Sequence, residues 1–251
     1  MRRCRAVIFD LDDTLVQTSR IDRASILIAA LTVITDARRA EAAAVRFAAL
    51  LKAEPFPPSP GEMVASWRTS LWARALGGEL SELAVGDAEA VQQAHDTWVA
   101  ERLGRFKLSA EVRAMVRRLQ SAGYTTGVLT NGSTEVQRAK VDACGACELF
   151  GAERVIVAGE HPEQKPAPSI FRTACAALGQ SVESAVMVGD SLSADVAGGI
   201  NAGMLATVWV KGALGDSLMK EPATAGAVER PQPTYTVGTV LELEAVLDLI
   251  N

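Results

Sequence analysis

The strongest constraint on the fold is the alternation of short apolar runs with amphipathic segments after residue 108. The apolar runs predict strands at residues 125–129, 155–158, 185–188, 206–210 and 234–237. The segments around them predict helices at residues 109–121, 134–143, 169–178, 194–202 and 240–249. Strands that alternate with helices form a parallel sheet that is covered on both faces. With a further buried strand at residues 5–10, the chain is predicted to be an α/β protein with a doubly wound, Rossmann-like parallel sheet.

The stretch between the first strand and this alternating region has no strand signal. Four alanine-rich segments in it carry apolar residues at helical spacing, at residues 21–34, 39–52, 61–76 and 87–103. Prolines between residues 55 and 60 separate the second segment from the third, and Gly77 with Gly78 ends the third. We therefore expect a helical cap domain at residues 17–107, inserted into an α/β core formed by residues 1–16 and 108–251. Trp67, Trp72 and Trp98 are expected in the core of this helical bundle.

Composition excludes several classes of protein. With 251 residues the chain can bury a core without disulfide or metal support. Its net charge of −5 favours no nucleic-acid partner. The longest uncharged apolar stretch, residues 26–34, is too short to span a bilayer, and the charge of Asp10 interrupts the first apolar run, unlike a secretory signal. We therefore expect a cytoplasmic protein with no nucleic-acid or membrane partner, as a monomer or a weak homodimer.

The four cysteines and two histidines indicate no zinc site or catalytic triad. Cys144 and Cys147 form the one closely spaced pair, and no second pair or neighbouring histidine completes a zinc site. The pair follows a predicted helix, whereas a thioredoxin-type motif lies at a strand-to-helix turn. Two interpretations stay open: a redox-active pair, or reduced and half-buried thiols.

Polar side chains follow three of the predicted core strands. Asp10 and Asp12 follow the first strand, and because alternate strand residues share a face, both can point into one crevice. Thr130 and Asn131 follow the second strand, where backbone amides open a helix that can bind an anion. Asp190 follows the strand at residues 185–188. Taken singly, each group is equally consistent with a solvated turn or an ordinary helix cap.

Together these groups supply what phosphoryl transfer needs. The carboxyl ends of parallel strands meet at one edge of the sheet, where open α/β sheets bind ligands. Carboxylates such as Asp10 and Asp190 are preferred ligands of Mg²⁺. Thr130 and Lys165 can hold phosphoryl oxygens while charge shifts in the transition state. One carboxylate can then act as a nucleophile and a second as a general acid and base, so the sequence favours a phosphoryl-transfer site.

Four motifs in this order resemble those of the haloacid dehalogenase superfamily. They are FDLDDTL at residues 9–15, LTNGS at 129–133, KPAPSIF at 165–171 and VGDSLSADVAGG at 188–199. The helical insert after the first motif is similar to the cap domain of that superfamily, so the resemblance spans the whole chain. Further strings at residues 68–72, 143–147, 163–171 and 201–209 resemble the phosphatases of this superfamily that act on a phosphorylated sugar acid.

This resemblance implies a Mg²⁺-dependent phosphatase that works through an aspartyl-phosphate. Asp10 would attack phosphorus and bind the metal. Asp12 would protonate the leaving oxygen and then activate water, and its backbone carbonyl would ligate the metal. Asp190 would complete the metal site, and Asp195 would orient Lys165 or a metal-bound water. The second acid, Asp12, argues against a dehalogenase because a halide leaving group needs no proton.

The resemblance also implies a phosphate-binding site and leaves the choice of substrate to the cap. The phosphate would be held by the backbone amides of Leu11 and Asn131, the Thr130 hydroxyl and Lys165. Arg68 and Trp72 lie one helical turn apart, so we hypothesise that Arg68 binds the substrate's carboxylate. A surface ion pair or a core-facing stem is the alternative for Arg68. A sugar-phosphate mutase or a phosphoglycolate-type phosphatase would share the same core residues, and a non-catalytic binding protein would keep only the fold.

Overall fold

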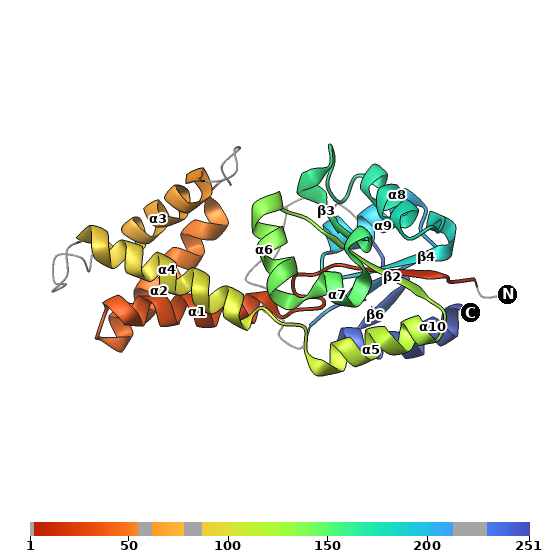
Figure 1. Cartoon of the computed structure of the whole chain (residues 1–251), viewed down its shortest axis with the longest axis horizontal. Helices are drawn as coiled ribbons and strands as arrows, with labels where there is room; N and C mark the ends of the chain where they lie inside the picture. Colours follow the sequence, from red (N-terminus) through yellow and green to blue (C-terminus); the bar gives the residue numbers. More distant parts are fainter. Residues whose placement is uncertain (1–2, 55–61, 78–86, 213–229) are drawn as a thin grey trace. The chain divides into compact units, whose positions relative to one another are not determined.

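The computed structural model describes residues 3–54, 62–77, 87–212 and 230–251 (Figure 1). The chain forms two compact units. Met1–Gln17 and Lys107–Asn251 make up one unit, and Thr18–Phe106 make up the other. The insert expected at residues 17–107 is one residue longer at each end than the second unit.

In its described residues, the larger unit is built on a six-stranded sheet in the order β3-β2-β1-β4-β5-β6, and every neighbouring pair is parallel. The strands are β1 (Ala6–Phe9), β2 (Thr125–Thr130), β3 (Val155–Val157), β4 (Ala185–Gly189), β5 (Ala206–Val210) and β6 (Tyr235–Val237). The chain winds outward from β1 through β2 to β3 and then returns past β1 to β4. In open α/β sheets such a reversal opens a crevice at the carboxyl ends of the strands.

Helices cover both faces of this sheet, which confirms the predicted doubly wound fold (Figure 1). One face carries α8 (Pro168–Ala177) and α9 (Ala197–Ala202), and the other carries α5 (Ala110–Ser121) and α10 (Leu243–Ile250). Alternate side chains of β1 point to opposite faces of the sheet. Ile8 belongs to the apolar cluster of α8, whereas the ring of Phe9 lies 6.1 Å from that of Phe150. Both faces of β1 are therefore buried, which is why its sequence is uninterruptedly apolar.

The helix ends follow local capping chemistry, and two predicted helices begin differently from expectation. The Ser109 hydroxyl accepts a hydrogen bond from the Val112 N–H, which confirms the predicted start of α5. The helix predicted at residues 194–202 is instead a π-helical turn, Leu192–Val196, followed by α9. The helix predicted at 240–249 opens with a 3₁₀ turn, Val240–Glu242, before α10.

The predicted helix at 134–143 is α6 (Thr134–Cys144), which ends at Gly145 in the left-handed conformation with φ of 66°. A glycine adopts this conformation without steric cost, so the chain turns there directly into α7 (Ala146–Phe150). Helix α7 is not predicted by the sequence pattern. Its five residues are too few to display a helical period.

The smaller unit consists, in its described residues, of four helices, all of which were predicted. They are α1 (Thr18–Val33), α2 (Ala37–Ala53), α3 (Glu62–Leu76) and α4 (Asp87–Arg105). The Phe47 ring stacks on Trp72 at a centroid distance of 3.9 Å and meets the edge of Trp98 at 5.1 Å. Trp67 is half-buried against the same cluster. The predicted core positions of Trp72 and Trp98 are thus confirmed, whereas Trp67 packs against the edge of this core.

Among the described residues, none of the helices combines the length and the apolar character that a membrane span requires.

We predict that Trp72→Ala destabilises the protein by about 3–5 kcal/mol, because it removes a fully buried ring and leaves a cavity against Phe47. Urea unfolding followed by circular dichroism measures this loss. Trp67→Ala, at a half-buried position, serves as the control and should cost clearly less. A loss below about 1 kcal/mol for Trp72→Ala would contradict the central role of this ring in the helical unit.

Candidate active site

Three neighbouring strand ends deliver predicted site residues to the crevice. Asp10 follows β1, and its backbone N–H donates to the Val188 carbonyl of β4 at 2.8 Å. Thr130 is the last residue of β2, and Asp190 directly follows β4. Because β1 lies between β2 and β4, the topology places these three positions side by side.

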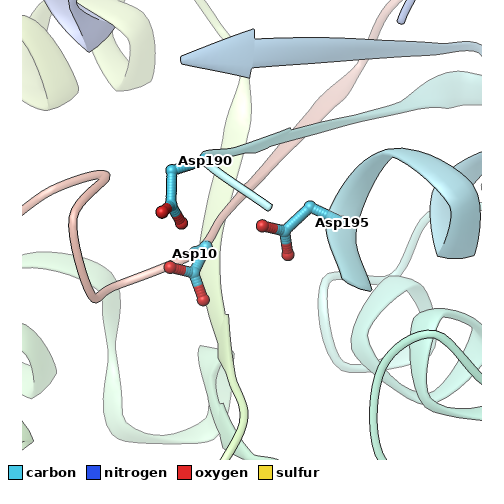
Figure 2. A group of neighbouring side chains, drawn as sticks. All are labelled: Asp10, Asp190 and Asp195. Carbon is cyan, nitrogen blue, oxygen red and sulfur yellow. The ribbon is translucent and has the colours of Figure 1, made fainter. Parts of the chain in front are cut away.

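Three carboxylates gather at this edge of the sheet. One oxygen of each of Asp10, Asp190 and Asp195 lies within 4.8 Å of the others, and the side chains converge on a common space (Figure 2). Burial, partly offset by the charge of Lys165, raises the pKa of Asp10 to about 7. Burial, together with the charges of Asp10 and Asp195, raises the pKa of Asp190 to about 8. The cluster therefore holds more negative charge than its own surroundings stabilise.

Lys165 is the cation of this cluster. Its Nζ donates to Asp10 Oδ1 at 2.6 Å, to Asp195 Oδ1 at 2.7 Å and to the Leu129 carbonyl at 2.9 Å. Its side chain is only 2% exposed. Burial acts to lower the pKa of Lys165, but the charges of Asp10 and Asp195 outweigh it and raise that pKa above its ordinary value. The ammonium is therefore charged and oriented between two carboxylates.

The segment that carries Lys165 is fixed by the Asn131 side chain. Asn131 Nδ2 donates to the Lys165 carbonyl at 2.8 Å, and the Lys165 N–H donates to Asn131 Oδ1 at 2.9 Å. Asn131 thus acts through its side chain as a clamp between the end of β2 and the lysine. The phosphate-binding role expected for the backbone amides of Asn131 and of Leu11 stays a prediction.

The Asp12 carboxylate faces α6. Lys140 Nζ donates to its two oxygens at 2.7 and 2.9 Å, and Gln137 Nε2 donates to Oδ2 at 2.9 Å. The loop bends here because Asp13 has a positive φ of 56° and the N–H groups of Leu15 and Val16 donate to the Leu11 carbonyl. The alternation of strand residues allows Asp10 and Asp12 to point into one crevice. The structure directs Asp10 to Lys165 and Asp12 to Lys140.

Gln137 and Lys140 were not predicted as site residues, although the sequence contains a signal for them. The buried positions of α6 are 137, 140, 141 and 144, a spacing at which an amphipathic helix normally carries apolar residues. Gln137 and Lys140 occupy two of these positions and are only 2% and 6% exposed. Polar residues buried in an apolar stripe need partners, and the partners here are Asp12, Thr130 and the Asn131 carbonyl.

Comparisons with known proteins agree with this geometry. Residues 4–203 match the haloacid dehalogenase-like hydrolase family. The chain is 34% identical to the N-acylneuraminate-9-phosphatases of Rattus norvegicus and of Homo sapiens, over 100% of this chain and 96% of each relative. The solved structure of the hydrolase YfnB from Bacillus subtilis superposes with a TM-score of 0.65 at 21% identity, over 98% of this chain and 100% of that one.

The chain belongs to the haloacid dehalogenase-like hydrolases. All four motifs lie within the matched residues 4–203, and the alignment with the full-length relatives covers both units. The family resemblance of the motifs is thereby confirmed. The structural match, at this level of identity, supports the fold alone.

The cysteine pair of this hydrolase has the properties of unreactive thiols. Cys144 is fully buried, and its thiol donates to the Val141 carbonyl. Burial raises the pKa of Cys144 to about 11 and also raises that of Cys147. A redox-active cysteine needs a lowered pKa, since the thiolate is the reacting form. The structure therefore favours the interpretation of reduced thiols, with Cys147 partly buried as expected and Cys144 fully buried.

The structure places Arg68 against the core of the helical unit. Its Cζ lies 5.1 Å from the centre of the Trp98 ring, and Arg102 Cζ lies 5.6 Å from the same centre. Trp72, the expected companion of Arg68, is fully buried against Phe47. These contacts favour the core-facing stem over a contact with substrate, and the substrate role of Arg68 stays a hypothesis.

We predict that, in the metal-free hydrolase, Asp190→Asn stabilises the fold increasingly as the pH rises from about 4 to 8. Folding raises the pKa of Asp190 from its ordinary 3.8 to about 8, so the folded state keeps a proton that the unfolded chain releases. The stability of the unsubstituted protein therefore falls over this range, and asparagine removes that loss. Thermal unfolding in a chelator at several pH values measures the difference.

Glu244→Gln is a control of opposite sign for this measurement. The hydrogen bond from Arg118 lowers the pKa of Glu244, so its ion pair stabilises the fold above about pH 4.5 and is lost on acidification. This exposed pair should contribute no more than about 1 kcal/mol. A metal-free Asp190→Asn protein that is less stable than the unsubstituted one at pH 8 would contradict the raised pKa.

Proposed function

We propose that this hydrolase is a Mg²⁺-dependent phosphatase that cleaves N-acylneuraminate 9-phosphate to the free sugar acid and inorganic phosphate. The observation that carries the proposal is the 34% identity with the N-acylneuraminate-9-phosphatases over the whole chain. That match includes the helical unit as well as the core. Because the core residues can grip only the phosphoryl group, a shared substrate requires similarity in the helical unit too. Similarity confined to the core would support no more than phosphoryl chemistry.

In the proposed reaction, a carboxylate oxygen of Asp10 attacks phosphorus while the bond from phosphorus to the sugar oxygen breaks. Asp12 gives its proton to that leaving oxygen, so the sugar departs as an alcohol. Water then attacks the phosphorus of the aspartyl-phosphate and loses a proton to Asp12. The bond to Asp10 breaks, which releases phosphate and regenerates both carboxyl groups in their starting states.

The phosphoryl group would be held by Lys165, the Thr130 hydroxyl and the backbone amides of Leu11 and Asn131. Lys165 supports this role because it is charged, buried and already directed at Asp10 by Asp195. A cation fixed in a site with little water stabilises negative charge more strongly than a solvated one, and it needs no reorganisation during the reaction.

The acidic cluster fits a divalent cation. With all groups ionised, Asp10, Asp190, Asp195 and Lys165 carry a formal charge of −2, and the raised pKa values of Asp10 and Asp190 indicate that this charge is poorly stabilised. Oxygen donors of this kind suit Mg²⁺. We propose that Asp10, Asp190 and the Asp12 backbone carbonyl hold the ion, while Asp195 is retained by Lys165. The bound ion would supply positive charge to the phosphoryl oxygens.

We predict that the hydrolase releases phosphate from N-acetylneuraminate 9-phosphate faster than from hexose phosphates or phosphoglycolate. Activity should require Mg²⁺ and disappear in excess chelator. A colorimetric phosphate assay over this substrate panel, with and without Mg²⁺, measures both effects. Asp10→Asn should lower turnover at least about a thousandfold, because it removes the nucleophile. Asp248→Asn, an exposed acid on α10, is the matched control and should retain full activity.

The same substrates separate the alternatives when product identification and a binding measurement accompany the phosphate assay. Preference for phosphoglycolate would assign the chain to the phosphoglycolate-type phosphatases, and conversion of a hexose phosphate to its isomer would identify a mutase. Undiminished turnover by Asp10→Asn would overturn the mechanism. Binding of the esters without phosphate release by the unsubstituted protein would indicate a non-catalytic member of the fold. The expected cytoplasmic location and the monomer or weak homodimer stay predictions.

A further inference from the structure

Lys140 is a buried lysine outside the acidic cluster, and its charge is directed at Asp12. Its side chain is 7% exposed, against 28% for Asp12. Its Nζ contacts both carboxylate oxygens, at 2.7 and 2.9 Å, and Gln137 adds a donor to one of them at 2.9 Å. Such a set of donors limits the directions that the short Asp12 side chain can adopt.

An apolar residue at position 140 would serve packing better. Val141 and Cys144 continue the buried stripe of α6, and a lysine ammonium taken out of water costs several kcal/mol unless it is well paired. A buried ion pair is seldom a gain in stability over apolar side chains of similar size. The position of this charge is therefore better explained by its partner, Asp12, than by the packing of α6.

Gln137 connects Asp12 to the end of β2. Its Nε2 carries two hydrogens and shares them among three acceptors, Asp12 Oδ2 at 2.9 Å, the Asn131 carbonyl at 2.8 Å and Thr130 Oγ1 at 2.5 Å. A threonine hydroxyl that accepts this bond keeps its own hydrogen for another acceptor. One amide thus orients both the proposed acid and the hydroxyl proposed to hold the phosphoryl group.

We propose that Lys140 and Gln137 are positioning residues that direct the Asp12 carboxyl group at the leaving oxygen of the substrate. This inference rests on the proposed phosphatase mechanism, in which Asp12 gives a proton to that oxygen as the bond to phosphorus breaks. In this proposal Lys140 acts through Asp12, to which its Nζ donates two hydrogen bonds.

The leaving group provides a readout that a loss of structure does not reproduce. An alkyl ester must leave with a proton from Asp12, because an alkoxide is too basic to leave alone. The nitrophenolate of p-nitrophenyl phosphate is a stable anion and leaves without that proton. The value of kcat/KM covers the steps up to departure of the leaving group. It therefore depends on proton donation by Asp12 for the alkyl ester and not for the aryl ester.

We predict that Lys140→Met lowers kcat/KM about 10- to 100-fold for the alkyl phosphate that the unsubstituted enzyme cleaves fastest, and by less than about threefold for p-nitrophenyl phosphate. Steady-state kinetics of the full chain at saturating Mg²⁺ provides both values. Lys140→Arg, which keeps the charge, should recover most of the alkyl activity. Gln137→Met should reproduce the selective loss in weaker form. Lys52→Met, at an exposed position on α2, should change neither value.

A double-mutant cycle with Asp12→Asn tests whether Lys140 acts through Asp12. In that background Lys140→Met should cause no further loss on the alkyl ester. Thermal unfolding verifies that each variant is folded. If Lys140→Met does not fold, kcat/KM on the alkyl and aryl esters is compared for Lys140→Arg and Gln137→Met instead. Equal losses on the two esters, or additive losses in the cycle, would overturn the proposal. A wild-type enzyme inactive on both esters would instead refute the proposed function, and this inference with it.

Discussion

The buried contact of Lys165 with Asp10 and Asp195 is the interaction on which the site depends. It joins residues that follow β1, precede α8 and lie on the turn before α9, so three segments far apart in the sequence must close together for one ammonium to be paired. The backbone at the end of β4 lies close enough to Asp195 to exclude a side chain there. A β-carbon at Gly189 would lie 2.2 Å from Asp195 Oδ2, so the end of β4 leaves room only for glycine. Breaking such a buried pair typically costs about 3–5 kcal/mol, because the remaining charge has no partner.

Among the described residues, the site has two buried lysines that pair with different carboxylates. Lys165 is held by the acidic cluster, whereas Lys140 is held by Asp12 on the side of α6. The two aspartates of the first motif, only two residues apart, thus contact different lysines. Burial is the main cause of the raised pKa of Asp10, and the nearby charge of Asp12 adds to it.

Much of the fold could be predicted from the sequence because its signals are local. The apolar runs of β1 and β4 are buried on both faces, and Ser109 caps α5 through a neighbour three residues away. The positions of Asp10, Thr130 and Asp190 followed from the rule that parallel strands end at one edge. The contacts of Gln137 and Lys140 with Asp12 could not be predicted in this way, because they join residues about half the chain apart. The sequence pattern shows that Gln137 and Lys140 lie on a buried helical face, but it does not identify Asp12 as their partner.

The inserted helical unit also affects how the sheet is assembled. Ala6 of β1 pairs with Thr125 of β2, so the central strands meet only after the whole insert has been spanned. Within the insert, Asp22 near the start of α1 binds Arg102 near the end of α4 through two hydrogen bonds, which holds the two ends of that unit side by side. Once those helices have folded, the chain that remains to be closed between β1 and β2 is short. The entropy of closing a loop grows only with the logarithm of its length, by about 0.6 kcal/mol per doubling. An insert whose ends meet therefore adds little to the entropic cost of pairing β1 with β2. Its size or sequence can differ from one protein to another without disturbing the pairing of the strands.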